Sequence, residues 1–410
     1  MQNKRYAKGN LRLKKGEYQR SSNTFEYKWT DQNGKRQSVS AKTLAELRKK
    51  EDEINKNTLD GYDYNELDAS INQYYDLWKQ IKSGIRDSTF KSYTRVYQRY
   101  IEPSFGKTKL RNLSYSKIVL FLKSLIGGRG LKIGTIKKVH QVLGMILEVA
   151  VKDGVLRNNP CRGALRELQK EYVDDVKQVR ALTLDEQKLF EEFLSRPGRY
   201  NKWYPVFTVM LWTGMRVGEV IGLQWEDIDF DNNQIRVEHS LEYYDIGLKE
   251  GSTYAMNPPK TKNSIRVVPM LPIVKEAFRL EKERQEAFGI KCEANIDGFS
   301  NFVFLNNKGW VHSHKRLNYS LSTITNAINK YIATNGNTYG IKEFPHVHNH
   351  MLRHTFATRM REAGTDIKAT ASILGHNDIA ITLYTYTDAS QEFKSREISI
   401  LDDYYRNQAG

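Results

Sequence analysis

The stretch "LGHNDIAITLYTYTDAS", residues 374–390, places a histidine directly after a glycine and two tyrosines shortly afterwards. His376 precedes Tyr384 by eight residues and Tyr386 by ten. Two tyrosines separated by one residue are compatible with simple packing, but a phenol beside a base or several cations can also act as a nucleophile. Which reading holds depends on the groups that the rest of the chain can bring to these hydroxyls.

The composition favours an intracellular protein that binds a polyanion. The chain has 410 residues, which is typical of two or three domains, and a formal net charge of +16. Such an excess of Lys and Arg favours a phosphate backbone as partner, because bound cations release its counterions. A basic protein with a merely solvated surface is the alternative. The two cysteines and the lack of an apolar signal core or membrane span indicate a soluble protein of the reducing cytoplasm.

Residues 1–63 are predicted to form a small module of a three-stranded sheet and a helix. The Asn-Gly pair in "DQNGK", residues 31–35, favours a tight hairpin. Phe25, Tyr27 and Trp29 alternate along one strand, so we expect them to share a face and form the core. The helix that follows carries its leucine and isoleucine residues on one side.

The same module is rich in positive charge, with 15 basic and 8 acidic side chains among residues 1–60. A β-ribbon fits the major groove of DNA, and the basic residues of the sheet are therefore candidates for DNA contacts. These candidates are Lys14, Lys15, Arg20, Lys28, Lys35 and Arg36.

Residues 64–168 are predicted to be helical. Apolar and tyrosine side chains recur at helical spacing between residues 93 and 100, while Lys91, Arg95 and Arg99 fall on another face. That triplet is a further DNA-binding candidate, and a solvated charged face explains it equally well. The stretch "LRELQKEYVDDVKQVR", residues 165–180, is polar and charged and is predicted to be a linker to a third block, residues 178–410.

Two motifs of the third block contain cations at positions where a helix or strand begins. In "TGMRVGE", residues 213–219, Gly214 ends an apolar helix and Arg216 begins the next. An arginine between apolar helices is costly to bury unless an anion meets it. Glu219 could be that anion or could hold the helix N-terminus, and a structural salt bridge is the alternative to a functional role. In "KTKNSIRVVP", residues 260–269, Lys262 precedes an alternating strand, where a lysine is ordinarily just solvated.

The stretch "HVHNHMLRHTFATRMREAG", residues 346–364, predicts a helix that begins near Asn349. His350 and Arg353 then lie side by side, because residues three apart share a helix face. Four histidines in nine residues invite a zinc hypothesis, but no Cys or Glu completes a known ligand spacing, and His350 and His354 lack the Glu of H-E-x-x-H. We therefore expect no metal.

Together these pieces suit chemistry on a phosphodiester. Arginine forks bind non-bridging phosphate oxygens and counter the charge that grows in the transition state. A tyrosine hydroxyl can attack if its proton is taken, a histidine can take or give that proton, and a lysine can protonate the departing sugar oxygen. A metal-dependent nuclease would use clustered carboxylates instead, and none stands out.

The four motifs "TGMRVGE", "KTKNSIRVVP", "HMLRHTFAT" and "LGHNDIAITLYTY" resemble those of the tyrosine recombinases, or phage-type integrases, most closely those of conjugative transposons and temperate phages. The resemblance spans about residues 67–395 and implies a multidomain, mainly α fold with small β-sheets. It implies an arm-type DNA-binding domain in residues 1–63, a helical, SAM-like core-binding domain in residues 64–168, and an α+β catalytic domain with a C-terminal tail in residues 178–410.

Carried over by motif, the resemblance assigns catalytic roles to six residues: Arg216, Lys262, His350, Arg353, His376 and Tyr386. Lys260 is the alternative to the hairpin lysine. In this family the nucleophile follows the last histidine by nine or ten residues; nine leads to Thr385, which has no phenol, and ten leads to Tyr386. Tyr384 is expected to pack or to contact DNA.

The resemblance also implies the mechanism and the partners. Tyr386 would form a 3′-phosphotyrosyl bond with double-stranded DNA, without ATP, metal or cofactor, and a homo-tetramer would exchange strands at core-type sites while the N-terminal module holds arm-type sites. Residues 392–410 would dock on a neighbouring protomer. An excisionase and a DNA-bending protein are further expected partners, and the expected location is the bacterial nucleoid in the cytoplasm. Three alternatives remain: a type IB topoisomerase-like enzyme, a non-catalytic DNA-binding regulator of the same fold, and a metal-dependent nuclease.

Overall fold

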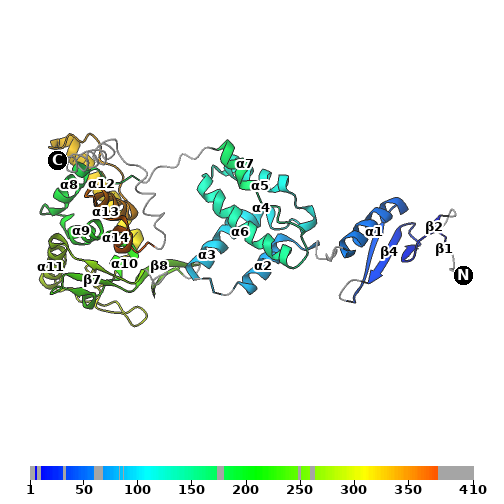
Figure 1. The fold of residues 1–410 in the computed structure, drawn as a ribbon, viewed down its shortest axis with the longest axis horizontal. Coiled ribbons are helices and arrows are strands. Elements are labelled where there is room, and N and C mark those ends of the chain that lie inside the picture. The colour runs from blue at the N-terminus through cyan, green and yellow to red at the C-terminus, as the bar shows by residue number, and fades with distance from the viewer. Residues whose placement is uncertain are drawn as a thin grey trace, which may run out of the picture. The chain divides into compact units, whose positions relative to one another are not determined.

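The computed structural model describes residues 5–6, 11–30, 34–59, 68–82, 84–85, 87–172, 180–247, 251–258 and 264–376. The chain divides into two compact units, residues 1–176 and residues 177–410. Helices predominate in both units, and each sheet has two or three antiparallel strands (Figure 1). The multidomain, mainly helical fold class predicted from the sequence is confirmed.

The N-terminal module is a three-stranded antiparallel sheet in the order β3-β4-β5, covered on one face by a helix. Phe25 and Tyr27 are buried against that helix and Trp29 packs beside them, so the predicted core is confirmed. The register runs from Phe25↔Ala41 to Thr30↔Arg36 and confirms the hairpin, although residues 31–33 of its turn lie outside the described residues. The elements are β1 (Arg5–Tyr6), β2 (Arg12–Leu13), β3 (Glu17–Gln19), β4 (Phe25–Thr30), β5 (Arg36–Ala41) and α1 (Leu44–Leu59).

The rest of the first unit is a bundle of helices around its own apolar core. Ser70 caps the first of them with a reciprocal capping box, and Trp78 and Tyr97 are fully buried. A π-helical turn interrupts the tyrosine-rich helix. The elements are α2 (Ile71–Ile81), α3 (Asp87–Val96), the π-helix η2 (Tyr97–Ile101), α4 (Glu102–Phe105), the 3₁₀-helix η3 (Leu110–Asn112), α5 (Tyr115–Arg129), α6 (Ile133–Lys152) and α7 (Ala164–Glu171).

Helix α7 occupies part of the stretch that the sequence predicted to be a linker. Ala164 and Leu168 are fully buried and belong to the core of the helical bundle. The linker prediction is therefore wrong up to Glu171, because two apolar side chains four residues apart bury one face of an otherwise charged segment. Residues 173–179 lie outside the described part of the chain.

In the second unit, helices surround α9, and two small sheets lie beside them (Figure 1). Helix α9 is apolar on nearly all sides and is buried between α8, α11 and α13. Thr183 and Glu186 form a capping box at the start of α8. The helices are α8 (Leu184–Ser195), η4 (Asn201–Trp203), α9 (Tyr204–Thr213), α10 (Val217–Ile221), η5 (Trp225–Asp227), α11 (Pro272–Ala287), α12 (His314–Asn335), α13 (Asn349–Glu362) and α14 (Ile367–Leu374).

The strands of this unit form a sheet in the order β10-β7-β6 and a separate hairpin of β8 and β9, all antiparallel. They are β6 (Ile228–Asp229), β7 (Gln234–Val237), β8 (Ser240–Gly247), β9 (Gly251–Asn257) and β10 (Arg266–Pro269). Across the described ranges of both units, no helix combines the length and the apolar character that crossing a bilayer requires.

Candidate active site

The tight passage from α9 to α10 sets the position of Arg216. Gly214 ends α9 with a left-handed backbone, φ +62°, and a Cβ at this position would lie 2.4 Å from the ring of Phe356. Only glycine fits both the conformation and the space. Arg216 follows as the N-cap residue of α10.

Glu219 serves Arg216 in both of the ways that the sequence left open. Its Oε2 accepts the backbone N–H of Arg216 at 2.8 Å, which caps the helix, and its Oε1 accepts Nη1 of the same arginine at 3.0 Å. Burial by itself would raise the pKa of Glu219, but hydrogen bonds and charge from Arg266 and Arg216 outweigh it and hold the pKa below its usual value. Glu219 is therefore an anion that fixes the guanidinium of Arg216.

Arg353, on α13, is buried at the centre of the same region, with 5% of its surface exposed. Its Nη1 donates to the carbonyl oxygen of Gly214 at 2.8 Å, and its Nη2 donates to that of Leu374 at 2.7 Å. Burial and the charge of Arg216 lower the pKa of Arg353 to about 9, although Glu219 opposes them. Among the described residues no carboxylate lies within ion-pair distance of Arg353, so an added anion would relieve a buried positive charge.

Two predicted histidines lie beside these arginines. His350 lies in the first turn of α13, and its ring meets that of His354 edge-on, with 4.5 Å between the ring centres. Burial and the charges of Arg353 and Arg216 lower the pKa of His376 to about 4, and burial and Arg353 also lower the pKa of His350. Both imidazoles are thus neutral near pH 7 and can accept or pass on a proton.

Four of the six predicted catalytic residues come together from three distant segments. Arg216 donates through Nη2 to the carbonyl oxygen of Gly375 at 3.1 Å, and Arg353 donates to that of Leu374, the preceding residue. His376 follows Gly375 directly in the chain. Each guanidinium keeps N–H donors beyond these bonds, and two forks in this arrangement can grip one tetrahedral anion.

The other predicted groups lie outside the described residues. Lys262 and its alternative Lys260 precede β10, which begins at Arg266. Tyr386 and Tyr384 follow His376, the last residue that the structure describes. Their roles therefore stay predictions.

The sequence did not identify Arg266, which also holds residues of this site in place. Its side chain is 5% exposed and donates two hydrogen bonds to Glu219, at 2.8 and 3.2 Å. The signal was present: Ile265 and Val267 alternate with Arg266 along the strand, so if one set faces outward, the arginine faces inward. Both apolar side chains are in fact exposed.

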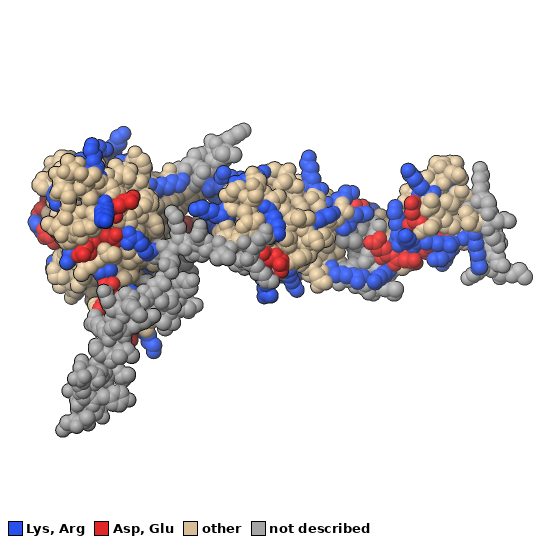
Figure 2. Space-filling model, turned by 90° about the horizontal axis from the view of Figure 1, so that it is seen from above, with Lys and Arg blue, Asp and Glu red and all other residues tan. Residues whose placement is uncertain are grey.

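The six DNA-binding candidates of the N-terminal module are all exposed, but three of them have carboxylate partners. Figure 2 shows blue Lys and Arg side chains close to red Asp and Glu side chains on this module. Arg20 forms a bidentate ion pair with Glu26, in which Nη2 and Nε donate to the carboxylate at 2.5 and 3.0 Å. The Nζ of Lys28 lies 3.6 Å from the same carboxylate. Lys14 lies 3.8 Å from Glu51. Within the described residues, Lys15 and Arg36 have no carboxylate partner, and Lys35 makes a contact of its own.

In the helical bundle, Arg95 and Arg99 are exposed and Lys91 is partly buried. Lys91 and Arg95 lie one turn apart on α3, whereas Arg99 lies in the π-helical turn and places its guanidinium 5.5 Å from the Tyr100 ring. The three residues, expected on one face of a single helix, are thus divided between an α-helix and a π-helix.

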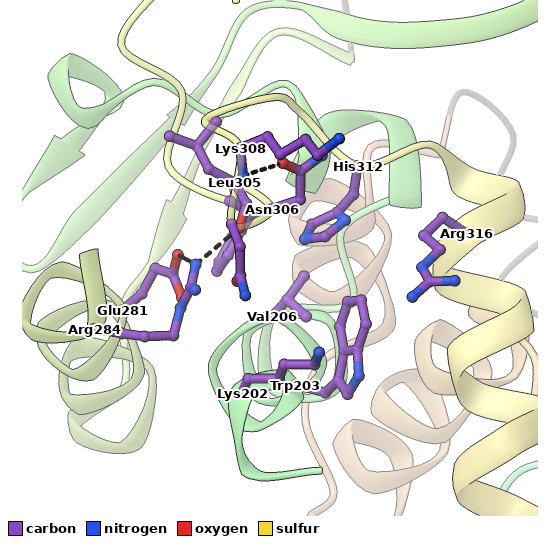
Figure 3. Close-up of a pocket in the computed structure, with 12 residues that line it drawn as sticks. Lys202, Trp203, Val206, Glu281, Arg284, Leu305, Asn306, Lys308, His312 and Arg316 are labelled. Atoms are coloured by element: carbon purple, nitrogen blue, oxygen red, sulfur yellow. Dashed lines mark hydrogen bonds and ion pairs between the residues drawn. The ribbon is translucent and has the colours of Figure 1, made fainter. Parts of the chain in front are cut away.

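Within the described ranges, no three His, Cys, Asp or Glu side chains are grouped as a metal ion would require. A cavity of about 410 Å³ lies elsewhere in the second unit, between η4, α9, α11 and α12 (Figure 3). Trp203 and His312 line it together with Lys202 and Arg316. None of the four predicted catalytic residues that the structure describes lines this cavity.

Comparison with known proteins finds family matches in three parts of the chain. Residues 180–392, just over half of it, match the phage integrase family. Residues 1–58 match the DNA-binding domain of the Tn916 integrase, and residues 70–126 match the N-terminal SAM-like domain of phage integrases.

Full-length relatives agree with these matches. The transposase from transposon Tn916 of Enterococcus faecalis is 28% identical over 410 residues and covers 95% of each chain. A XerC-like tyrosine recombinase of Caldanaerobacter subterraneus subsp. tengcongensis is 27% identical over 92% of this chain and 94% of its own.

Among solved structures, the Tn1549 transposon integrase in complex with transposon right end DNA is 25% identical, with a TM-score of 0.70, over 82% of this chain and all of that one. These likenesses do not favour a topoisomerase-like enzyme or a non-catalytic regulator. The chain therefore belongs to the phage integrase family and is a tyrosine recombinase of the conjugative-transposon type, an enzyme that cleaves and rejoins DNA.

Proposed function

We propose that Tyr386 attacks a DNA phosphate gripped by Arg216 and Arg353, and that this chemistry integrates and excises a mobile element. The observation that carries the proposal is the pair of guanidinium groups bonded to the consecutive carbonyls of Leu374 and Gly375. Two forks held this close can bind the non-bridging oxygens of one phosphate and stabilise the charge that develops there.

The remaining groups would move protons. The phenolic oxygen of Tyr386 forms a bond to phosphorus, the bond from phosphorus to the 5′-oxygen breaks, and Lys262 gives that oxygen a proton. His350 and His376, neutral near pH 7, would accept the phenolic proton or hold the phosphate by a hydrogen bond. The products are a 3′-phosphotyrosyl bond and a free 5′-hydroxyl, and attack by the 5′-hydroxyl of the partner strand reverses the chemistry and joins the new strands.

We further propose that the three parts of the chain bind DNA at different sites. Residues 1–63 would hold arm-type sites, and residues 64–168 together with residues 178–410 would hold the core-type site. The family matches of residues 1–58 and 70–126 support this division, as does the net charge of the chain. The Tn1549 integrase is solved with transposon end DNA and with circular intermediate DNA, which supports the same substrate class here.

Four protomers would act together on two core sites, and residues 392–410 of each would dock on a neighbour. An excisionase and a DNA-bending protein would set the direction, and the work would take place on the bacterial nucleoid in the cytoplasm. Deletion of residues 392–410 tests the docking. It should leave single-site binding intact and reduce cooperative synapsis in native gel electrophoresis; unchanged synapsis would refute it.

A suicide substrate tests the chemistry. A core site nicked beside the cleavage position releases a short oligonucleotide, so the covalent complex accumulates. The wild type should become attached to DNA in the presence of EDTA, and Tyr386→Phe should not. Attachment that needs a divalent cation, or that survives in Tyr386→Phe, would contradict the proposed function.

A further inference from the structure

Arg266 points into the second unit from β10, while its apolar neighbours point out. Ile265 is 55% exposed and Val267 50% exposed, whereas the Arg266 side chain is 5% exposed. Strand β10 is an edge strand and pairs with β7 through backbone hydrogen bonds. This pairing does not require a charged side chain that points inward. A buried guanidinium at this position therefore calls for an explanation other than the sheet.

All three nitrogen atoms of this guanidinium are engaged. Nη2 and Nη1 donate to the two carboxylate oxygens of Glu219 at 2.8 and 3.2 Å, and Nη1 also donates to the carbonyl oxygen of Ser264 at 3.1 Å. Nε donates to the carbonyl oxygen of Ile373 at 2.5 Å. Arg266 thus joins three chain segments that carry or border the predicted catalytic residues.

Two of these contacts bear directly on the site. Glu219 accepts from Arg266 with the same two oxygens that hold Arg216, so one carboxylate fixes both guanidinium groups. The segment before His376 packs on Arg266 so closely that a Cβ on Gly375 would lie 3.0 Å from Nη1. Removing Arg266 would therefore loosen Arg216 on one side and the backbone of His376 on the other.

We propose that Arg266 is a positioning residue for strand cleavage, which orients Arg216 through Glu219 and the His376 segment through the Ile373 carbonyl. The proposal rests on the proposed function. Arg266 is too deeply buried to touch DNA itself, and it acts through the groups that do. A misplacement of about 1 Å in a catalytic group can cost about 100-fold in rate, so this role is measurable.

Because Arg216 and Arg266 share the Glu219 carboxylate, loss of Arg266 should also change how the reaction rate depends on pH. A simple loss of stability would not have this effect. Three charged groups act on Glu219: Arg216 from α10, Arg266 from β10 and Arg353 from α13. Without Arg266, burial is opposed chiefly by Arg216, so the pKa of Glu219 should rise and the carboxyl should become partly protonated. A protonated Glu219 holds Arg216 poorly, and higher pH should restore it.

The experiment measures single-turnover attachment to the suicide substrate and affinity for the core site, from pH 6 to pH 9. The variants are Arg266→Met, Arg266→Lys, and the double variant Arg266→Met with Glu219→Gln. Arg236→Met is the matched control, because Arg236 is an exposed arginine on the adjacent strand β7, opposite Val267. Thermal unfolding reports folding in each case.

Arg266→Met should attach to DNA about 100-fold more slowly at pH 7, with affinity within about 3-fold of the wild type. Its rate relative to the wild type should climb with pH, and this climb should vanish in the double variant, which has no carboxyl to titrate. Arg266→Lys should be slowed less, since one ammonium cannot reach all the acceptors, and it decides the matter if Arg266→Met does not fold.

Two results would overturn the proposal. One is an attachment rate equal to that of the wild type in Arg266→Met or Arg266→Lys. The other is a loss of rate matched by an equal loss of affinity at every pH, which is the behaviour of a residue that only stabilises the fold. Failure of the wild type to attach would instead contradict the proposed function, so the two failures are distinguishable.

Discussion

Arg216 and Arg353 lie on different helices, 137 positions apart in the chain, yet they donate to the carbonyl oxygens of two consecutive residues. Consecutive residues of a chain are only about 3.8 Å apart at Cα. The carbonyl groups of Leu374 and Gly375 therefore hold the two guanidinium groups near each other. The same backbone leads directly into His376.

Replacement of Arg353 by lysine should separate fork geometry from charge. The ammonium keeps the charge but cannot reach Gly214, Leu374 and a phosphate together, so attachment should fall by about 10²- to 10³-fold. Single-turnover attachment measures this. Arg359→Lys on the same helix is the control, because Arg359 bonds the Leu182 carbonyl and Glu362 instead. Equal rates for both variants would argue against a phosphate contact by Arg353.

Gly214→Ala should destabilise the second unit by more than Gly289→Ala. Both glycines have left-handed backbones, φ +62° and +60°, which costs an alanine about 1–2 kcal/mol. Only at Gly214 would the added Cβ also meet Phe356, at 2.4 Å, and Leu374, at 2.8 Å; nothing lies within 4 Å at Gly289. Denaturant unfolding of the two variants gives the difference. Equal losses would mean that the packing around Arg353 is looser than described.

His376 should titrate far below an ordinary histidine. Burial and the nearby arginines lower its pKa to about 4, so the unfolded chain, with a pKa near 6.5, takes up the proton first as the pH falls. The contribution of His376 to stability is thus complete above pH 6.5 and is lost as the pH falls towards 4. Nitrogen-15 NMR of the imidazole, assigned with His376→Gln, measures the midpoint; a midpoint near 6.5 would place the ring away from the arginines.

Two exposed cations of the N-terminal module should behave differently in DNA binding. Loss of a phosphate contact in Lys15→Ala should reduce the slope of log affinity against log salt by about 1 at arm-type DNA. Arg20→Ala should change this slope less, because Arg20 is already paired with Glu26. It should instead lower stability, because the buried Glu26 carboxylate would lose both of its hydrogen bonds from Arg20 and keep the more distant Lys28, at 3.6 Å, as its cationic partner. Salt titrations and unfolding of the module test the contrast; identical slopes for wild type and Lys15→Ala would exclude that contact.

The sequence was sufficient to place the end of α9 at Gly214 and the start of α13 near Asn349, since apolar helices leave a clear pattern in the sequence. The motifs pointed to Arg216, His350, Arg353 and His376, and the described structure brings all four together. Arg266 was not found, because its importance depends on the direction in which β10 faces its unit. Helix α7 was missed because charge hid its two buried positions.

The carboxylate partners of Lys14, Arg20 and Lys28 could not be predicted either. Cross-strand neighbours depend on register, and the partner of Lys14 comes from a helix instead of the sheet. Sequence gives the residue types of a basic surface, whereas its free charge depends on these pairings.

Mapping the covalent bond between protein and DNA tests the central claim most directly. After trapping on the nicked core site and digestion by protease and nuclease, mass spectrometry of the DNA-linked peptide should locate a 3′-phosphate on Tyr386 in the wild type. Arg216→Ala and Arg353→Ala should each leave this adduct at trace level. An adduct on Tyr384, or an undiminished one without either arginine, would contradict the account.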